Sequence, residues 1–292
     1  QPDILLCRTE HNIPQEERNK IALFCNIKRE CVIQAKDTYS IYKVPLNYHK
    51  EGLDIEILKK FNLPHEQTPD LTSWENIIEK INNPKDEVVI AIVGKYTSLE
   101  DSYKSICEAL DHSGISNNVK VKIKWLNSRK FLTDEVEEEL KDVNAILVPG
   151  AFGVEGAEGK IAAAKYARTN NIPYLGICFG MQMAVIEAAR NLCGMENASS
   201  TEFEYHENPV VGLMTEWEMP CGGKTQRKAG GNLGGTMRLG AYDCDLKEGS
   251  KVHQLYNINS ISERHRHRYE VNINYKDQLE QQGMIFSGIS PD

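Results

Sequence analysis

The chain has 292 residues, of which 40% are apolar and 26% are charged, the composition of an ordinary globular protein rather than a disordered one. Its 42 acidic residues outnumber its 34 basic residues, and the net charge of −8 argues against a general binder of nucleic acid or of membrane surfaces. No run of about 18 apolar residues predicts a membrane-spanning helix, and no signal peptide opens the chain. We therefore expect a cytoplasmic protein with neither nucleic acid nor membrane as a partner.

The eight cysteines lie at positions 7, 25, 31, 107, 178, 193, 221 and 244. No pair has the Cys-x-x-Cys spacing, and none has a histidine at the spacing typical of a metal site. The even number permits disulfides, but a chain of this length can build a core without them. Reduced thiols and no metal centre are the interpretation that the pattern favours.

The first 61 residues alternate short apolar runs with polar, charged stretches. This pattern predicts strands at 4–7, 21–25 and 31–33, and a helix at 53–61. Residues 62–86 contain three prolines and one short predicted helix at 74–81. We interpret 1–61 as one domain, 62–86 as a linker and 87–292 as a second domain.

From residue 87 the pattern changes to alternating strands and helices. Strands are predicted at 88–93, 119–125, 145–148 and 172–177, and helices at 99–110, 136–143, 161–168 and 181–193. Repeated strand–helix units predict an α/β fold with a parallel sheet flanked by helices. Further strands are predicted at 237–241 and 269–273, with a long exposed hairpin or loop at 219–235.

The most specific signal is the motif Gly-x-Cys-x-Gly at 176–180, directly after a predicted strand and before a predicted helix. This is the context of a nucleophile elbow, with Cys178 in place of serine. The helix N-terminus would favour the thiolate, and the Phe179 amide would stabilise an oxyanion. A lone cysteine in an apolar run is more often simply buried, but the two glycines and the strand–turn–helix context favour the functional interpretation.

A glycine-rich loop at 148–153 follows the preceding predicted strand. Ligands of open α/β sheets bind at the carboxyl ends of strands, so the Ala151 amide is a second candidate oxyanion donor. A phosphate cradle is the alternative, but the spacing matches neither a P-loop nor a dinucleotide fingerprint.

These motifs, Pro-Gly-Ala-Phe-Gly and Gly-Ile-Cys-Phe-Gly-Met-Gln within 147–182, resemble class I glutamine amidotransferases. Much of the remaining chain resembles one group of that family, the CTP synthases. The stretches that carry this resemblance are 1–8, 20–25, 195–198, 200–203, 234–240 and 263–271. The segment 216–233 resembles the bacterial type.

The resemblance implies a two-part enzyme. A glutaminase domain hydrolyses L-glutamine, and the ammonia reaches a synthase domain that aminates UTP to CTP with ATP and Mg²⁺. It further implies CTP as an inhibitor, GTP as an allosteric effector, and a homotetramer that stacks into filaments. Residues 1–61 would be the end of a P-loop-like synthase domain, and we expect the chain to be a fragment of a longer protein.

The resemblance also implies roles for individual residues. Cys178 would be the nucleophile, forming a glutamyl thioester. The proposed oxyanion and glutamine-binding residues are Ala151, Phe179, Gly180, Met181, Gln182, Glu202 and Arg268. The proposed nucleotide-binding residues are Lys20, Lys36, Asp37 and Thr38. An acidic and a basic partner, such as Glu202 and Arg268, suit the ammonium and the carboxylate of a free amino acid.

This sequence departs from the family pattern at two oxyanion positions, where the family has glycine for Ala151 and leucine for Phe179. A backbone amide survives both changes, although we expect the Phe179 ring to narrow the pocket. The family's catalytic histidine and glutamate would lie after Asp292, so this chain alone is expected to be inactive. His49 and Glu51 have the same spacing as that histidine and glutamate, but they lie in the first domain and are not candidates for the catalytic pair.

Plainer interpretations stay open for several residues. Glu202 and Arg268 could be a solvated pair, and Lys20 a surface lysine. The basic run 263–270, with His265 and His267, could be an exposed edge strand, although the resemblance implies that it supports the substrate and the domain interface. The side chains expected in the core are Met181, Met183 and Trp125.

Two alternative functions remain at this stage. One is an inert structural or assembly module. The other is a related hydrolase such as a γ-glutamyl peptidase, which would need no synthase remnant in residues 1–60.

Overall fold

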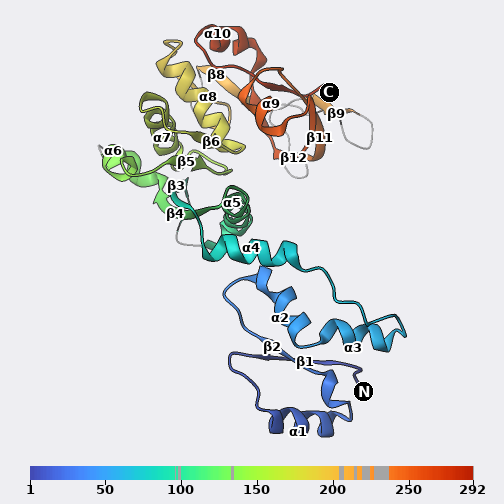
Figure 1. Ribbon diagram of the computed structural model, residues 1–292. Helices are drawn as coiled ribbons and strands as arrows, with labels where there is room; N and C mark the ends of the chain where they lie inside the picture. The colour runs from blue at the N-terminus through green and yellow to red at the C-terminus, as the bar shows by residue number, and fades with distance from the viewer. Residues whose placement is uncertain are drawn as a thin grey trace. The chain divides into compact units, whose positions relative to one another are not determined.

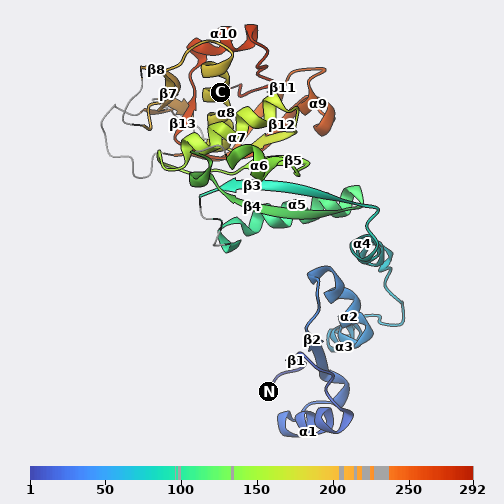
Figure 2. The ribbon, with the colours of Figure 1, turned by 90° about the vertical axis from the view of Figure 1, so that its left-hand side faces the viewer.

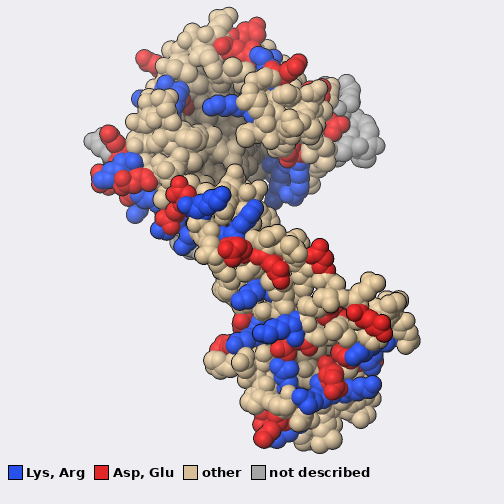
Figure 3. Space-filling view, in the orientation of Figure 1, with Lys and Arg blue, Asp and Glu red and all other residues tan. Residues whose placement is uncertain are grey.

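The computed structural model describes residues 1–95, 97, 100–132, 135–203, 207–213, 216–218, 224–226 and 237–291. The chain forms two compact units, Gln1–Glu87 with Ile106–Lys120 (unit 1) and Val88–Ser105 with Val121–Asp292 (unit 2). Figure 3 shows charged side chains of both signs crowded on one face of unit 1, whereas uncharged surface dominates the same view of unit 2. No helix in the described ranges is long and apolar enough to cross a membrane.

Unit 1 contains two parallel strands, β1 (Leu5–Thr9) and β2 (Val32–Lys36), in which Leu5 pairs with Val32 (Figures 1 and 2). Its helices are α1 (Gln15–Cys25), α2 (Val44–Lys50), α3 (Leu53–Lys60), α4 (Thr72–Asn82) and most of α5 (Lys104–Asn117). The predicted strands at 4–7 and 31–33 and the predicted helices at 53–61 and 74–81 are confirmed, within one to three residues at their ends.

The predicted strand at 21–25 is wrong, because these residues are the last turns of α1. The helix starts after Pro14 and ends at Asn26, which has the left-handed backbone conformation of a C-cap (φ 50°). The preceding polar stretch contains no helix breaker, so the helix continues through the apolar run. The run is not a core segment either, since Leu23 and Phe24 are 78% and 87% exposed.

Unit 2 is built on a four-stranded sheet with strand order β4-β3-β5-β6. The strands are β3 (Asp86–Gly94), β4 (Val119–Asn127), β5 (Ala145–Val148) and β6 (Tyr174–Gly176). Strand β5 runs parallel to both β3 and β6. The helices α6 (Glu135–Leu140), α7 (Ala157–Thr169) and α8 (Phe179–Asn191) follow β4, β5 and β6, and α7 and α8 pack on each other (Figure 1). The predicted α/β fold with a parallel sheet is therefore confirmed.

Several predicted helices have displaced boundaries, including the helix expected at 161–168, which begins at Ala157. The helix expected at 99–110 begins at Lys104, after the short 3₁₀ turn Glu100–Tyr103, and continues to Asn117. The helix expected at 181–193 begins at Phe179, directly after Cys178, because the turn from β6 is tighter than the sequence pattern indicates.

The C-terminal part of unit 2 adds two three-stranded sheets, with orders β13-β8-β7 and β12-β11-β14. Their strands are β7 (Ala198–Ser200), β8 (Asn208–Leu213), β11 (Arg238–Leu246), β12 (Ser260–His267), β13 (Tyr269–Val271) and β14 (Gly288–Ile289). The predicted strands at 237–241 and 269–273 correspond to parts of β11 and β13. The sequence pattern missed the short helices α9 (Lys251–Tyr256) and α10 (Lys276–Gln281).

Strands β9 (Glu216–Glu218) and β10 (Lys224–Gln226) form an antiparallel pair. Most of the hairpin predicted at 219–235 lies outside the described residues. The remaining 3₁₀ segments are η1 (Arg29–Cys31), η2 (Ile41–Lys43), η4 (Ser128–Leu132) and η5 (Ile273–Tyr275).

Two hydrophobic clusters meet where β6 turns into α8. One cluster contains Phe179 and Met183 of α8 together with Val210 of β8. The other contains Val148 of β5 and Ala163 of α7. The turn that carries Cys178 is thereby held by packed side chains on both sides.

Candidate active site

Cys178 lies at a tight turn between β6 and α8. Its backbone has φ 53° and ψ −105°, a conformation that a residue with a side chain rarely adopts. The flanking glycines are required for close packing. A Cβ at Gly176 would lie 2.5 Å from the Gly180 carbonyl carbon, and one at Gly180 would lie 2.0 Å from the Val148 carbonyl oxygen. The predicted elbow geometry is therefore present, and its strain is held by backbone contacts.

The Cys178 thiol is half-buried and lies 3.7 Å from the Arg266 carbonyl oxygen, to which it can donate. Burial is the main influence on its pKa, which is raised above the ordinary value, with a further increase from Glu202. The Phe179 amide hydrogen bond and Lys160 act in the opposite direction. The helix N-terminus thus favours the thiolate as predicted, but burial outweighs it in this state of the protein.

The loop after β5 brings the second candidate oxyanion residue beside the elbow. A Cβ built on Gly150 would lie 3.6 Å from the Cys178 Cβ, so this loop passes directly by the cysteine. Ala151 follows Gly150 and is half-buried. The Phe179 side chain is fully buried, 6.3 Å from the Phe203 ring centroid. The expectation that the Phe179 ring narrows a pocket is wrong, because the ring packs into the core.

Glu202 and Arg268 lie close to the same loop. The Gly153 amide donates to Glu202 Oε1 at 2.7 Å. Burial raises the pKa of Glu202, while the Gly153 amide and the nearby Arg268 lower it. The Arg268 guanidinium lies 5.5 Å from the centroid of the Phe152 ring, and its Nε is buried with no hydrogen-bond partner among the described residues. The interpretation as a freely solvated pair does not fit this burial.

The remaining proposed oxyanion and glutamine-binding residues, Gly180, Met181 and Gln182, differ in burial and in their hydrogen bonds. Gln182 is 3% exposed, and its side-chain amide donates to the Tyr269 carbonyl oxygen at 2.7 Å, which ties α8 to β13. The Gly180 carbonyl accepts from the Tyr174 hydroxyl at 2.8 Å. Met181 is 41% exposed, so its expected place in the core is wrong, whereas Met183 is fully buried as expected.

The basic run 263–270 is mostly β12 and is only partly an exposed edge. His267 Nε2 lies 2.6 Å from Glu270 Oε1, which Arg238 also contacts at 3.2 Å. The His265 ring lies 5.1 Å from that of His267, and burial lowers its pKa. This network links β11, β12 and β13 next to Arg268, which fits a role in supporting the site.

Sequence reasoning missed Lys160, on the first turn of α7. Its side chain is fully buried, and its Nζ lies 4.7 Å from the Phe179 ring centroid. Cys178 and Glu202 both raise the pKa of Lys160 and so favour its charged form. The only available signal was a lysine between Gly159 and the apolar residues 161–164, which an exposed helix face would explain equally well.

The nucleotide-site candidates all lie in unit 1. Lys20 Nζ pairs with Glu17 at 2.9 Å on an exposed part of α1. Lys36 Nζ donates to Asn12 at 3.0 Å, and Asp37 pairs with Arg8 at 3.1 Å. Thr38 follows directly after Asp37 and is half-buried. His49, which shares a spacing with the family's catalytic histidine, pairs instead with Asp54 at 2.7 Å within unit 1.

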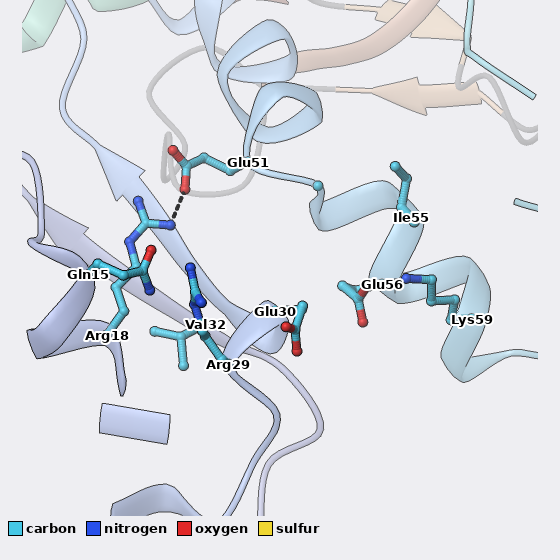
Figure 4. A pocket seen from close by; sticks show the side chains of 10 residues that line it. Gln15, Arg18, Arg29, Glu30, Val32, Glu51, Ile55, Glu56 and Lys59 are labelled. Carbon is cyan, nitrogen blue, oxygen red and sulfur yellow. Dashed lines mark hydrogen bonds and ion pairs between the residues drawn. The ribbon is translucent and has the colours of Figure 1, made fainter. Parts of the chain in front are cut away.

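Two cavities open beside these elements. One, of about 440 Å³, is lined by Lys36, Arg18 and Lys50 together with Glu51. The other, of about 390 Å³, is shown in Figure 4, where Arg18 points toward Glu51 and forms an ion pair with it at 2.9 Å. Lys20 lines neither of these two cavities. Within the described ranges, no group of three or more His, Cys, Asp or Glu side chains is arranged to hold a metal ion.

Comparison with known families divides the chain in two. Residues 98–292 match the family Glutamine amidotransferase class-I, and residues 1–63 match the family CTP synthase N-terminus. The second match argues against a γ-glutamyl peptidase, for which no synthase remnant is expected.

Individual relatives agree with this division. The chain is 57% identical to the CTP synthase of Rhodospirillum centenum and 58% identical to that of Parvibaculum lavamentivorans, each over 100% of this chain and 54% of the relative. The chain thus spans about half the length of the curated relatives it matches. A solved structure, the Trypanosoma brucei CTPS glutaminase domain with bound acivicin, matches with a TM-score of 0.61 and 38% identity, over 70% of this chain and 75% of that chain.

Proposed function

The chain belongs to the class-I glutamine amidotransferase family, in its CTP synthase group, and from this premise we propose that unit 2 hydrolyses L-glutamine at Cys178. The observation that carries the proposal is the strained Cys178 backbone at the strand–helix turn, flanked by two glycines at which a Cβ would clash with neighbouring backbone. Such strain is costly and is typical of positions where a nucleophile is presented to substrate.

In the proposed reaction, the Cys178 thiolate attacks the side-chain carbonyl carbon of glutamine. A carbon–sulfur bond forms, and the carbonyl oxygen becomes an oxyanion near the Phe179 and Ala151 amides. When the carbon–nitrogen bond breaks, the nitrogen takes up a proton and leaves as ammonia. Water then cleaves the glutamyl thioester to glutamate and restores the thiol.

Glu202 and Arg268 are proposed to bind the α-ammonium and the α-carboxylate of glutamine. The Gly153 amide fixes one oxygen of Glu202, which leaves the other free for a cationic partner. The buried Arg268 Nε without a partner supports a role in binding an anion. Gln182 acts on the site by holding β13 against α8, since its amide is already bonded to Tyr269.

The proton donors and acceptors for this reaction are proposed to be the family's histidine and glutamate, which the 292 residues do not include. His265 and His267 are not proposed as substitutes, because among the described residues the Cys178 thiol contacts the Arg266 carbonyl oxygen and no contact to either ring is present. Loss of a catalytic base lowers the rate by about 10⁴-fold or more, so we propose that this chain alone binds glutamine but turns it over slowly.

In the complete enzyme, the ammonia is proposed to aminate UTP with consumption of ATP. The cations Arg18, Lys36 and Lys50 around the 440 Å³ cavity suit a phosphate group, and Lys20 is a further proposed nucleotide-binding residue. Among the described residues, no cluster fits the Mg²⁺ that the family implies. GTP activation, CTP inhibition and a tetramer are further family-based proposals.

The proposed function is tested in the full-length protein with Cys178→Ser. We expect glutamine-dependent CTP formation to fall by about 10⁴-fold or more, whereas added ammonium salt still supports CTP formation. The matched control is Cys193→Ser, another half-buried cysteine of unit 2, which should retain both activities. Retention of glutamine-dependent synthesis by Cys178→Ser would refute the assignment.

A further inference from the structure

Lys160 is a cation buried without a counter-ion in contact. Its side chain has no exposed surface, and its Nζ has no hydrogen-bond partner among the residues described. A buried ammonium of this kind is expensive, and an apolar side chain of similar length would be expected to give a more stable core. The charge is therefore a candidate for a functional rather than a structural role.

The position of Lys160 connects it to the reacting cysteine. Its Nζ lies against the face of Phe179, the residue that follows Cys178 and whose amide bonds to the thiol. The first turn of α7 packs closely against the backbone at Ser128. A Cβ at Gly159 would lie 1.7 Å from the Ser128 carbonyl oxygen. The lysine is thus held on the protein side of the elbow by helix packing.

The titratable groups that act on Lys160 come from three parts of unit 2. Cys178 at the start of α8 and Glu202 after β7 favour its charged form, whereas Lys95 after β3 disfavours it. Lys95 is itself paired with Glu155 at 2.8 Å, and Arg129 of η4 pairs with the same carboxylate. The two groups that favour the charged form of Lys160 are therefore the proposed nucleophile and the proposed substrate-binding carboxylate.

We propose that Lys160 is a positioning residue of the glutaminase site, whose buried ammonium favours the thiolate form of Cys178 and the carboxylate form of Glu202. Lys160 has no exposed surface, so it acts through these two groups rather than on the substrate. The inference rests on the proposed function, since a positioning role requires that Cys178 is the nucleophile. The effect of the Lys160 charge on the Cys178 thiol can nevertheless be measured without glutamine.

The pH dependence has a definite sign. Burial lowers the pKa of Lys160 to about 8, so the ammonium is mostly present at pH 7 and mostly lost above pH 9. The pKa of the Cys178 thiol is raised, so the thiolate is a minor species near pH 7, and its amount depends on the lysine charge. Lys160 should promote thiolate formation below pH 8 and have no effect above about pH 9.

The test is the rate at which iodoacetamide alkylates Cys178, followed by peptide mass spectrometry from pH 6 to 10. Relative to wild type, Lys160→Met should react about three- to tenfold more slowly at pH 6.5, and the two rates should converge above pH 9. The control Lys165→Met removes an exposed lysine of the same helix and should follow wild type at every pH. Equal rates, or a ratio that does not change with pH, would overturn the proposal.

A measurement on wild type alone covers the case in which Lys160→Met fails to fold. The logarithm of the alkylation rate should rise with pH, flatten near pH 8 as the lysine loses its proton, and rise again. A straight line over the whole range from pH 6 to pH 10 would overturn the proposal. Iodoacetamide needs no glutamine site, so this result is independent of the Cys178→Ser synthesis assay that tests the proposed function.

Discussion

The two units hold their candidate functional residues in opposite ways. In unit 2, Cys178, Glu202 and Lys160 are partly or fully buried, and backbone contacts or helix packing hold them in place. In unit 1, Lys20 is 60% exposed and pairs with a neighbour on its own helix. Charges in a low-dielectric interior affect one another strongly, whereas exposed pairs are screened by water. The proposed glutaminase site should thus respond to single substitutions far more than the candidate nucleotide-binding residues of unit 1 do.

The largest expected difference concerns backbone packing at the elbow. Gly180→Ala would place a methyl group 2.0 Å from the Val148 carbonyl oxygen, so β5 and α8 must separate, at a cost of about 3 kcal/mol or more. In unit 1, Gly52→Ala meets no atom within 4 Å and costs only about 1–2 kcal/mol through its positive φ. Hydrogen exchange in a urea series measures both units separately. If Gly180→Ala and Gly52→Ala lowered the free energy of unfolding by equal amounts, the predicted difference between the two units would be wrong.

The next effect concerns recognition of glutamine. Arg268→Ala should weaken the ability of glutamine to protect Cys178 from alkylation by about 10- to 100-fold, because a charge-assisted contact to the carboxylate is lost. Arg264→Ala, which changes an exposed arginine of β12, serves as the control and should bind as wild type does. Unchanged protection by Arg268→Ala would remove Arg268 from the site.

A smaller effect is expected on how the free energy of unfolding depends on pH. The folded-state pKa of Glu202 is raised, so its favourable contribution is complete below about pH 4.5 and is lost as pH rises through the folded value. Glu202→Gln can still accept from Gly153 and carries no charge. At pH 7 the variant should be more stable than wild type by a few tenths of a kcal/mol, and this gain should vanish by pH 4. Urea unfolding at both pH values measures the difference, with the exposed Glu248→Gln as control; a loss at pH 7 would contradict it.

The smallest effect is expected in unit 1. Lys20→Ala removes only the exposed pair with Glu17 and should change the free energy of unfolding by less than about 0.5 kcal/mol. Alkylation of Cys178 should stay at the wild-type rate. A change of tenfold or more in that rate would mean that the chemistry of the two units is coupled within this chain.

The elbow could be predicted because each of its requirements leaves a local mark: an apolar strand, two glycines around a cysteine, and a helix. Lys160 could not, since its burial results from α7 packing on η4 and from contact with Phe179, which the sequence does not reveal. The hydrogen bond that Gln182 makes could not be predicted for the same reason, because its partner Tyr269 lies 87 residues away in the sequence. Residues 21–25, the last turns of α1, are wrongly predicted as a strand because their apolar run resembles a buried strand, although Leu23 and Phe24 within it are exposed.

The most direct test of the account is competition at Cys178 between glutamine and a chloroketone analogue of glutamine, with every cysteine followed by peptide mass spectrometry. The account predicts that Cys178 is labelled much faster than Cys25 or Cys107, and that L-glutamine, but not D-glutamine, slows this labelling alone. Labelling of Cys178 at the same rate as the other two cysteines, or without protection by L-glutamine, would contradict the central claim that the strained turn presents a glutaminase nucleophile.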